Sequence, residues 1–162
     1  MPNDLTAQIG LVPHAKTVVE HLIDWTTEAP VHHALLAIDE TRCVSCEPKG
    51  ALIRLISDFP DAYWSDYDIA PGESDRIVVW ALAHVGAPYN YAADAAIGMY
   101  DIFGIRTPNR IERWLNNGTH FECAQFCDNA HRAGGRDPFA DRAPAMVSPA
   151  SFWHVWKAHG WA

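Results

Sequence analysis

The sequence predicts an α+β fold in which a small antiparallel sheet packs against helices. Short apolar runs that end at turn-forming residues gather in the first part of the chain, and longer runs with helical spacing follow. The chain has 162 residues, of which 49% are hydrophobic, enough to bury roughly 70% of the surface that its unfolded form exposes. We therefore expect residues 1–162 to form a single domain.

The predicted strands are short apolar runs bounded by turns. The candidates are residues 9–12, 34–38, 43–47, 52–56 and 67–70. A short turn, Asp39-Glu40-Thr41, joins the second and third of these runs, a pattern that favours a β-hairpin. Pro13 closes the first run, and Pro48-Lys49-Gly50 closes the third. We therefore expect neighbouring strands to pair antiparallel.

The predicted helices have apolar residues at helical spacing and lie mostly after residue 70. The candidates are residues 16–27, 74–85, 94–103 and 108–115, a helix that begins at Cys123, and a last helix from Pro149 to near His159. We expect Ser74 to cap the second of these helices and Gly86 to end it. Gly134 and Gly135 are expected to end the helix that begins at Cys123.

The chain is acidic, with a formal net charge of -8 from 12 Lys and Arg against 20 Asp and Glu. Nucleic acids and anionic membranes bind to a basic face, which this composition does not provide, so we expect neither as a partner. No apolar run reaches membrane-spanning length, and the first residues lack the basic and apolar regions of a secretory signal. We expect a cytoplasmic protein with reduced cysteines, unless it is exported by another route.

Cys123 and His33 form the most informative pair of residues. Cys123 is predicted to open a helix, where unpaired N–H groups and the helix dipole favour a thiolate, so we expect a depressed pKa. His33 lies near the start of a predicted strand, a rigid position from which an imidazole can meet the sulfur. His32 is the alternative base, and strand alternation is expected to send the two rings to opposite faces.

Three segments of the sequence resemble parts of one protein superfamily. They are Ala29-Pro30-Val31-His32-His33-Ala34, Gly86-Ala87-Pro88-Tyr89 and Phe121-Glu122-Cys123-Ala124. They are similar to the His-bearing strand, the Gly-x-Pro-Tyr segment and the aromatic-x-Cys-Ser segment of circularly permuted papain-fold proteins. These proteins are the YiiX-like and lecithin-retinol-acyltransferase-like branches of the NlpC peptidase superfamily. The resemblance covers nearly the whole chain and implies a permuted papain-like fold.

The resemblance also implies a catalytic triad. Cys123 would be the nucleophile, His33 the base, and Glu47, at the end of the following strand, the group that orients the imidazole. Alternation along the strand places Ser45 on the same face as Glu47, so a site-facing Glu47 predicts a site-facing Ser45. The expected site residues therefore come from two neighbouring strands and one helix start.

Further residues are expected to contact the substrate or its oxyanion. They are Tyr89, Ala124, His32 and Ser45, together with the backbone N–H of Cys123. Two of the residues beside Cys123 depart from the superfamily pattern. Ala124 stands where a serine is common, which removes a hydroxyl but keeps the backbone N–H. Glu122 would oppose thiolate formation if its carboxylate pointed inward.

The implied activity is hydrolysis of an amide or related acyl bond, and a peptide such as a cell-wall peptide is the expected substrate. Acyl transfer and lipid hydrolysis occur in the permuted branch and stay open, as does a catalytically silent binding or virion-associated module of the same fold. No cofactor and no metal are implied. The sequence does not indicate an oligomeric state.

A zinc site is the rival interpretation of the cysteines. Cys43-x-x-Cys46 has the spacing of a zinc knuckle, and Cys123-x-x-x-Cys127 would complete four sulfur ligands. In a strand, however, Cys43 and Cys46 point to opposite faces, so chelation would require the hairpin to break. The sequence therefore favours the thiol site over the zinc site.

Overall fold

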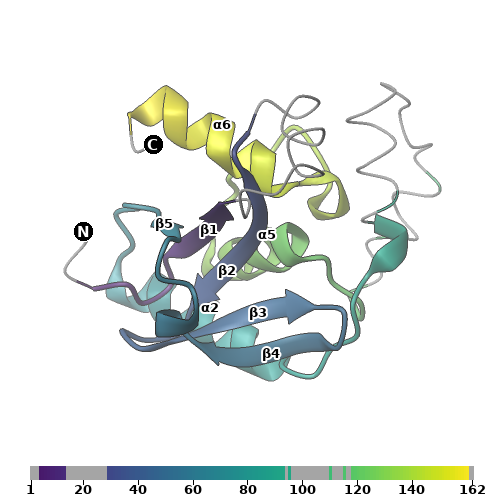
Figure 1. Ribbon diagram of the computed structural model, residues 1–162, viewed down its shortest axis with the longest axis horizontal. Coiled ribbons are helices and arrows are strands. Elements are labelled where there is room, and N and C mark those ends of the chain that lie inside the picture. The colour runs from purple at the N-terminus through teal and green to yellow at the C-terminus, as the bar shows by residue number, and fades with distance from the viewer. Residues whose placement is uncertain are drawn as a thin grey trace.

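The structure, a computed structural model, describes residues 4–13, 29–93, 95, 110, 115 and 118–160. These residues form an α+β fold around a five-stranded antiparallel sheet with the strand order β4-β3-β2-β1-β5 (Figure 1). The strands are β1 (Ile9–Pro13), β2 (Val31–Ala37), β3 (Arg42–Glu47), β4 (Gly50–Leu55) and β5 (Tyr63–Trp64). The helices are α2 (Pro71–Ala83), α5 (Cys123–Gly134) and α6 (Pro149–His159), with short 3-10 turns η1 (Ile56–Asp58) and η2 (Pro144–Met146).

The predicted hairpin is confirmed, and a second hairpin continues it. β2 and β3 pair antiparallel through Leu35 and Ser45, and β3 and β4 pair along their full length around Pro48-Lys49. The helix predicted over residues 16–27 lies outside the described residues. So do most of the two helices predicted over residues 94–103 and 108–115.

Residues 67–70 do not form the strand that their composition predicts. The Gln8 side chain takes the place of a neighbouring strand, because its amide nitrogen donates to the Tyr67 carbonyl at 2.8 Å and its amide oxygen accepts the Tyr67 N–H at 3.1 Å. The edge strand is instead β5, where Trp64 pairs with Gly10 of β1. A Cβ at position 10 would lie 2.9 Å from the indole, so this cross-strand pair requires glycine.

Helix α2 begins three residues before the predicted N-cap. Pro71 occupies its first turn, where a missing N–H costs nothing, and the Glu73 carboxylate accepts the Ala70 N–H at 3.1 Å. Ser74 therefore lies inside the helix and is not its cap. Helix α5 ends as predicted, with Gly135 in the left-handed conformation at a φ of 96°.

Helix α5 packs on one face of the sheet, and α2 packs against α5; Figure 1 shows both behind the sheet. The buried cluster between α5 and the sheet includes Ala34, Leu36, Val44 and Cys46 of the strands with Cys123, Phe126 and Cys127 of the helix. Helices α2 and α5 meet closely at Gly134, where a Cβ would lie 2.5 Å from the Ile77 side chain. This packing fixes the start of α5 against β2 and β3.

The opposite face of the sheet carries the alternate residues of the same strands. Ser45 pairs with Leu35, and Cys43 pairs with Arg54, so these side chains and those of His33 and Glu47 share this face. The Phe59 ring, just after η1, lies 6.5 Å from the His33 ring and 5.6 Å from the Arg54 guanidinium carbon. The sheet thus separates an apolar face under α5 from a face with a polar line of side chains.

No helix in the described ranges combines the length and the apolar character needed to cross a membrane.

Candidate active site

Cys123 is the first residue of α5, as predicted, and its side chain is buried, with 3% exposure. Glu122 is the N-cap of this helix. One carboxylate oxygen of Glu122 accepts the N–H groups of Ala124 and Gln125 at 2.9 and 3.0 Å, and the other accepts the Cys123 S–H at 2.7 Å. The carboxylate therefore points inward, onto both the helix start and the thiol.

The Cys123 sulfur lies against β2 at the residue that follows His33. The backbone N–H of Ala34 lies beside the sulfur and acts to lower the pKa of the thiol. Hydrogen-bonding groups alternate in direction along a strand, and those of Ala37 point toward β1, so the Ala34 N–H points toward β3. Pairing between β2 and β3 begins only at Leu35, which leaves this N–H for the sulfur. The thiol thus occupies the point where the two strands separate.

His33 begins a chain of hydrogen bonds that crosses three strands. Its Nε2 lies 2.8 Å from the Ser45 hydroxyl, Ser45 donates to a Glu47 carboxylate oxygen at 3.1 Å, and Arg54 donates to the same oxygen at 2.6 Å. A serine hydroxyl has one proton, which here goes to Glu47, so its oxygen accepts from His33. The proton of the neutral imidazole is therefore on Nε2, and Nδ1 carries the free lone pair.

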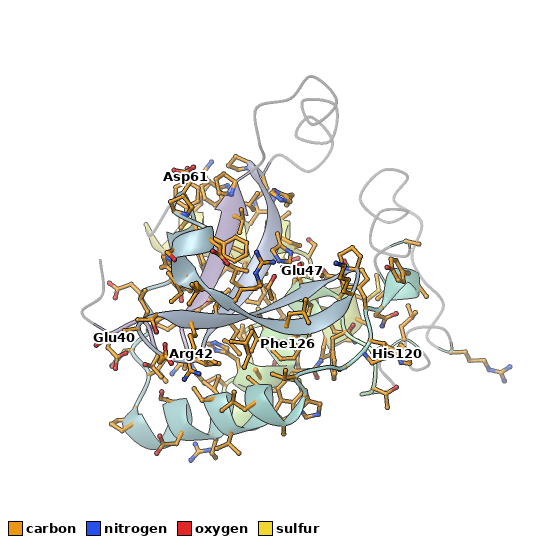
Figure 2. All side chains as sticks on the ribbon, turned by 60° about the horizontal axis from the view of Figure 1, so that its bottom comes forward. Glu40, Arg42, Glu47, Asp61, His120 and Phe126 are labelled. Atoms are coloured by element: carbon orange, nitrogen blue, oxygen red, sulfur yellow. The ribbon has the colours of Figure 1, made fainter. Side chains whose placement is uncertain are left out.

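The direct hydrogen-bond partner of the imidazole is Ser45, and Glu47 contacts the imidazole only through the Ser45 hydroxyl. The predicted role of Glu47, to orient the imidazole, therefore passes to Ser45, which in turn is held by Glu47. Figure 2 shows Glu47 on β3, on the side of the sheet away from α2. Arg54, on β4, was not expected at the site. The pairing of β3 with β4 brings it beside Glu47.

His32 and His33 are not separated by strand alternation, contrary to the prediction. The pairing between β1 and β2 shifts register at this point, since Val12 pairs with His33 but Pro13 pairs with Val31. His32 is thus an extra residue in the strand, as in a β-bulge, and the alternation is interrupted there. The two imidazole rings are stacked, with centroids 6.3 Å apart.

The protonation states of this site differ from those that the helix start predicts. Burial, the neighbouring Glu122 charge and the hydrogen bond to its carboxylate raise the pKa of the Cys123 thiol well above its ordinary value, while the Ala34 N–H acts in the opposite sense. The predicted depression of this pKa is therefore wrong, because the thiol is buried and because Glu122 occupies the helix N-terminus with a negative charge. Burial, with the charges of His32 and Arg54, lowers the pKa of His33 to about 4.

Two other predicted residues lie beside Cys123. The Ala124 N–H is held by Glu122 and is not available for an oxyanion, whereas the Cys123 N–H forms no hydrogen bond within the described residues. Tyr89 forms a bridge to Phe121 through flanking backbone bonds: Phe121 donates to the Pro88 carbonyl and Asn90 donates to the Phe121 carbonyl. The Gly-x-Pro-Tyr segment and the segment before Cys123 are therefore adjacent.

Gln125 and Asn90 connect the start of α5 to the segment that contains Tyr89, and the sequence analysis did not predict this role. The Gln125 side-chain oxygen accepts the Glu122 N–H and the Asn90 side-chain N–H, both at 3.2 Å. The spacing from Glu122 to Gln125 is that of a capping box, a signal that was present in the sequence. The contact to Asn90 joins residues 35 positions apart, which no local pattern indicates.

The cysteines do not form a zinc site. Cys46 belongs to the cluster under α5, while the Cys43 sulfur lies on the other face and contacts the Arg54 carbonyl at 3.8 Å. All four cysteines are buried and free. Among the residues that the structure describes, no group of three or more His, Cys, Asp or Glu side chains is arranged to hold a metal ion. The zinc alternative is therefore set aside.

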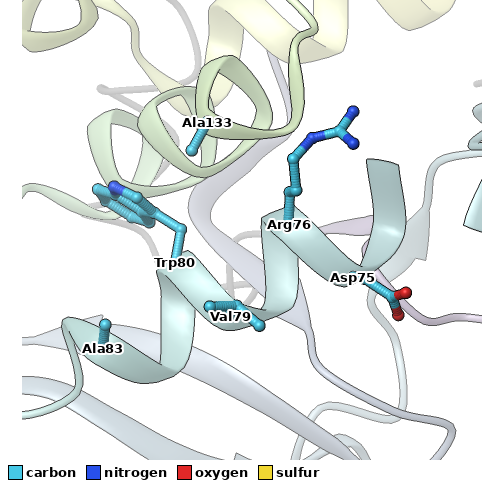
Figure 3. Close-up of a pocket in the computed structure, with 6 residues that line it drawn as sticks. All are labelled: Asp75, Arg76, Val79, Trp80, Ala83 and Ala133. Atoms are coloured by element: carbon cyan, nitrogen blue, oxygen red, sulfur yellow. The ribbon is translucent and has the colours of Figure 1, made fainter. Parts of the chain in front are cut away.

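A shallow apolar groove between α2 and α5 is remote from the thiol. It has a volume of about 460 Å³ and is lined by Asp75, Arg76, Val79, Trp80, Ala83 and Ala133 (Figure 3). Ala133 lies ten residues after Cys123, about 15 Å along the helix at 1.5 Å per residue. This groove is therefore not part of the candidate site.

His131, on the same helix, makes stability depend on pH. It is fully buried, its Nε2 lies 3.1 Å from the Ala7 carbonyl, and burial lowers its pKa to about 4. The unfolded chain takes up this proton near pH 6.5 and the folded chain does not, so stability is lost as pH falls from about 6.5 toward 4. With a pKa of about 4 in the folded protein and about 6.5 in the unfolded chain, His131 should lower the free energy of unfolding by about 2 kcal/mol between pH 7 and pH 5.

Urea unfolding of the wild type and of His131→Gln at both pH values measures this cost. The glutamine amide can still donate to Ala7 but does not titrate, so the variant should keep only the pH dependence that His33 and other groups contribute. Equal pH dependence in the two proteins would contradict the neutral buried state of His131.

Comparison with protein-family models, curated proteins and solved structures finds no match to this chain.

Proposed function

We propose that the protein is a cysteine-dependent hydrolase of the permuted papain type, which cleaves an amide or related acyl bond. The observation that carries this proposal is the position of the Cys123 sulfur against the residue that follows His33, an imidazole whose Nε2 proton is held by Ser45. His33 directly precedes the residue that the sulfur contacts, and its Nδ1, on the sheet face that Ser45 shares, is the proposed base. Histidine upstream and cysteine downstream is the order that the permuted arrangement requires.

The proposed reaction uses these groups in two steps. His33 Nδ1 takes the thiol proton as the Cys123 sulfur bonds to the substrate carbonyl carbon, and the Cys123 N–H stabilises the oxyanion. The imidazolium then gives the proton to the leaving amine or alcohol, and an acyl-thioester remains on Cys123. In the second step, water activated by His33 attacks the thioester, releases the acid and restores the thiol.

A peptide is the proposed substrate, and a cell-wall peptide is its proposed source. Transfer of the acyl group to an acceptor other than water would use the same thioester. In either case, the thiol form of Cys123 requires a reducing environment, which is why a cytoplasmic location is part of the proposal.

Covalent labelling with a small peptidyl epoxide tests the proposal. Mass spectrometry of the digested protein should find the adduct on Cys123, and Cys123→Ala should lose it. Cys127→Ser is the matched control, since Cys127 is on the same helix and equally buried, and this variant should be labelled like the wild type. Labelling spread evenly over the four cysteines, or absent from Cys123, would contradict the proposal.

Ser45 should matter more than Glu47 for this reaction. Ser45→Ala removes the direct partner of His33 Nε2, so the acylation rate should fall by about tenfold to a hundredfold, whereas Glu47→Gln keeps an acceptor for Ser45 and should cost less. Acylation rates of the two variants measure this difference. In addition, ¹⁵N NMR of the imidazole should show the Nε2–H tautomer in the wild type and a mixture in Ser45→Ala. A larger loss in Glu47→Gln would return the orienting role to Glu47.

A catalytically silent binding module is the second candidate function. The 3% exposure of Cys123 and the carboxylate on its S–H favour it. The epoxide experiment separates the two candidates, because a silent module leaves Cys123 unlabelled under conditions in which the protein remains folded.

A further inference from the structure

The Glu122 carboxylate is held in one position by several contacts. It accepts two backbone N–H groups and the thiol S–H, its own N–H is bound by Gln125, and its side chain is buried, with 2% exposure. A capping role needs only the contacts to backbone N–H groups, as Ser148 provides for α6. The additional contact to the sulfur therefore requires an account of its own.

That contact opposes formation of the thiolate, the nucleophilic form of a cysteine. A carboxylate that accepts the S–H favours the protonated sulfur, and its charge opposes the thiolate. Within the described residues, the titratable groups that interact with the pair are Cys127 on α5, which affects Cys123, and Cys46 on β3, which affects Glu122. No hydrogen bond joins the sulfur to His33 in the described part of the chain, so the S–H is directed to Glu122 and not to the base.

We propose that Glu122 is a restraint on the nucleophile: its carboxylate holds Cys123 as a thiol directed away from His33, and the thiol becomes reactive when the carboxylate withdraws. This inference rests on the proposed function. On release, the S–H proton moves to His33 Nδ1, which gives a thiolate and an imidazolium with no change in net charge. Glu122 is thus a positioning residue and not the base of the reaction.

The alternative role for Glu122, as the base that removes the thiol proton, predicts the opposite response to substitution. Glu122→Gln removes the charge and leaves one acceptor oxygen, which can serve the helix N–H groups or the S–H but not both. Under the restraint, the pH midpoint of Cys123 alkylation by iodoacetamide should fall by about one unit or more, so that alkylation at pH 7 becomes about tenfold faster. If Glu122 is the base, alkylation should slow.

The midpoint, read for each cysteine by peptide mass spectrometry, is the chosen measurement because limited access to a buried thiol slows alkylation at every pH without moving the midpoint. Cys43 in the same samples is the control. Burial raises the pKa of Cys43 to about 12, and its charged neighbours are Arg54, Asp58 and Glu47, not Glu122. Its rate should stay unchanged, and a rise would reveal partial unfolding.

Glu122→Asp is the second variant, needed if Glu122→Gln does not fold. Aspartate is a good N-cap, but its shorter side chain cannot hold the helix N–H groups and also reach the sulfur. Alkylation of Cys123 at pH 7 should therefore rise while thermal stability is retained. An unchanged or higher midpoint in Glu122→Gln, or unchanged alkylation in a folded Glu122→Asp, would overturn the restraint.

The restraint and the proposed function fail on different results. That function fails if the peptidyl epoxide does not label Cys123 in a manner that depends on His33. The restraint fails if simple alkylation of Cys123 does not respond to Glu122. The epoxide labelling and the alkylation are separate measurements, and each can be interpreted without the other.

Discussion

Replacement of His33 by alanine is expected to slow acylation of Cys123 by at least about a hundredfold, because the variant loses the proposed base for the thiol proton. The rate is measured as the growth of the acyl adduct on Cys123 after the protein is mixed with an activated peptide ester. Thermal unfolding of the variant shows whether the fold is kept. Since His33 is half-buried at the start of β2, we expect its removal to be tolerated.

His32→Ala is the matched control for this experiment. The two rings are adjacent, with centroids 6.3 Å apart, and it is His33 that forms the hydrogen bond to Ser45. His32→Ala should therefore change the acylation rate by no more than about threefold, well below the effect of a lost general base. If His32→Ala produced the large loss and His33→Ala the small one, His32 would be the base.

Replacement of Trp156 by alanine is expected to lower the free energy of unfolding by about 4 kcal/mol, the largest stability effect that we predict. Trp156 lies on α6 with no exposed surface, and its indole N–H donates to the Tyr67 hydroxyl at 3.2 Å. The variant leaves a large cavity and loses the hydrogen bond to the Tyr67 hydroxyl. Urea unfolding monitored by circular dichroism measures the loss.

Lys157→Ala is the control, because Lys157 is exposed on the next position of the same helix. It should change the unfolding free energy by no more than about 0.5 kcal/mol. A loss below about 1 kcal/mol in Trp156→Ala would mean that α6 does not contribute to the core in the way described.

The sheet and the helix ends were largely predictable, because local patterns determine them. Turn residues mark the hairpins of β2, β3 and β4, and Gly135 ends α5 with a positive φ. The strand predicted over residues 67–70 failed since a distant side chain, that of Gln8, satisfies the Tyr67 backbone in place of a strand. No pattern within residues 67–70 indicates this contact.

The positions of Cys123, His33 and Ser45 could be predicted from the sequence, but their protonation could not. A helix start lowers the pKa of a cysteine only if its N–H groups remain free, and here Glu122 takes two of them. Whether the Glu122 side chain points inward depends on the packing of Gln125 and Asn90. Likewise, the shift in pairing at His32 is a property of β1 and β2 together and cannot be read from either strand alone.

The central claim, that Cys123 carries the acyl group in a hydrolytic reaction, is tested most directly by a time course of intact mass after mixing with an activated peptide ester. The account predicts one acyl group on Cys123 that appears and then disappears while free acid accumulates, and no adduct or turnover in Cys123→Ala. Equal release of acid by wild type and Cys123→Ala, or no adduct on Cys123 from pH 5 to pH 10, would contradict it.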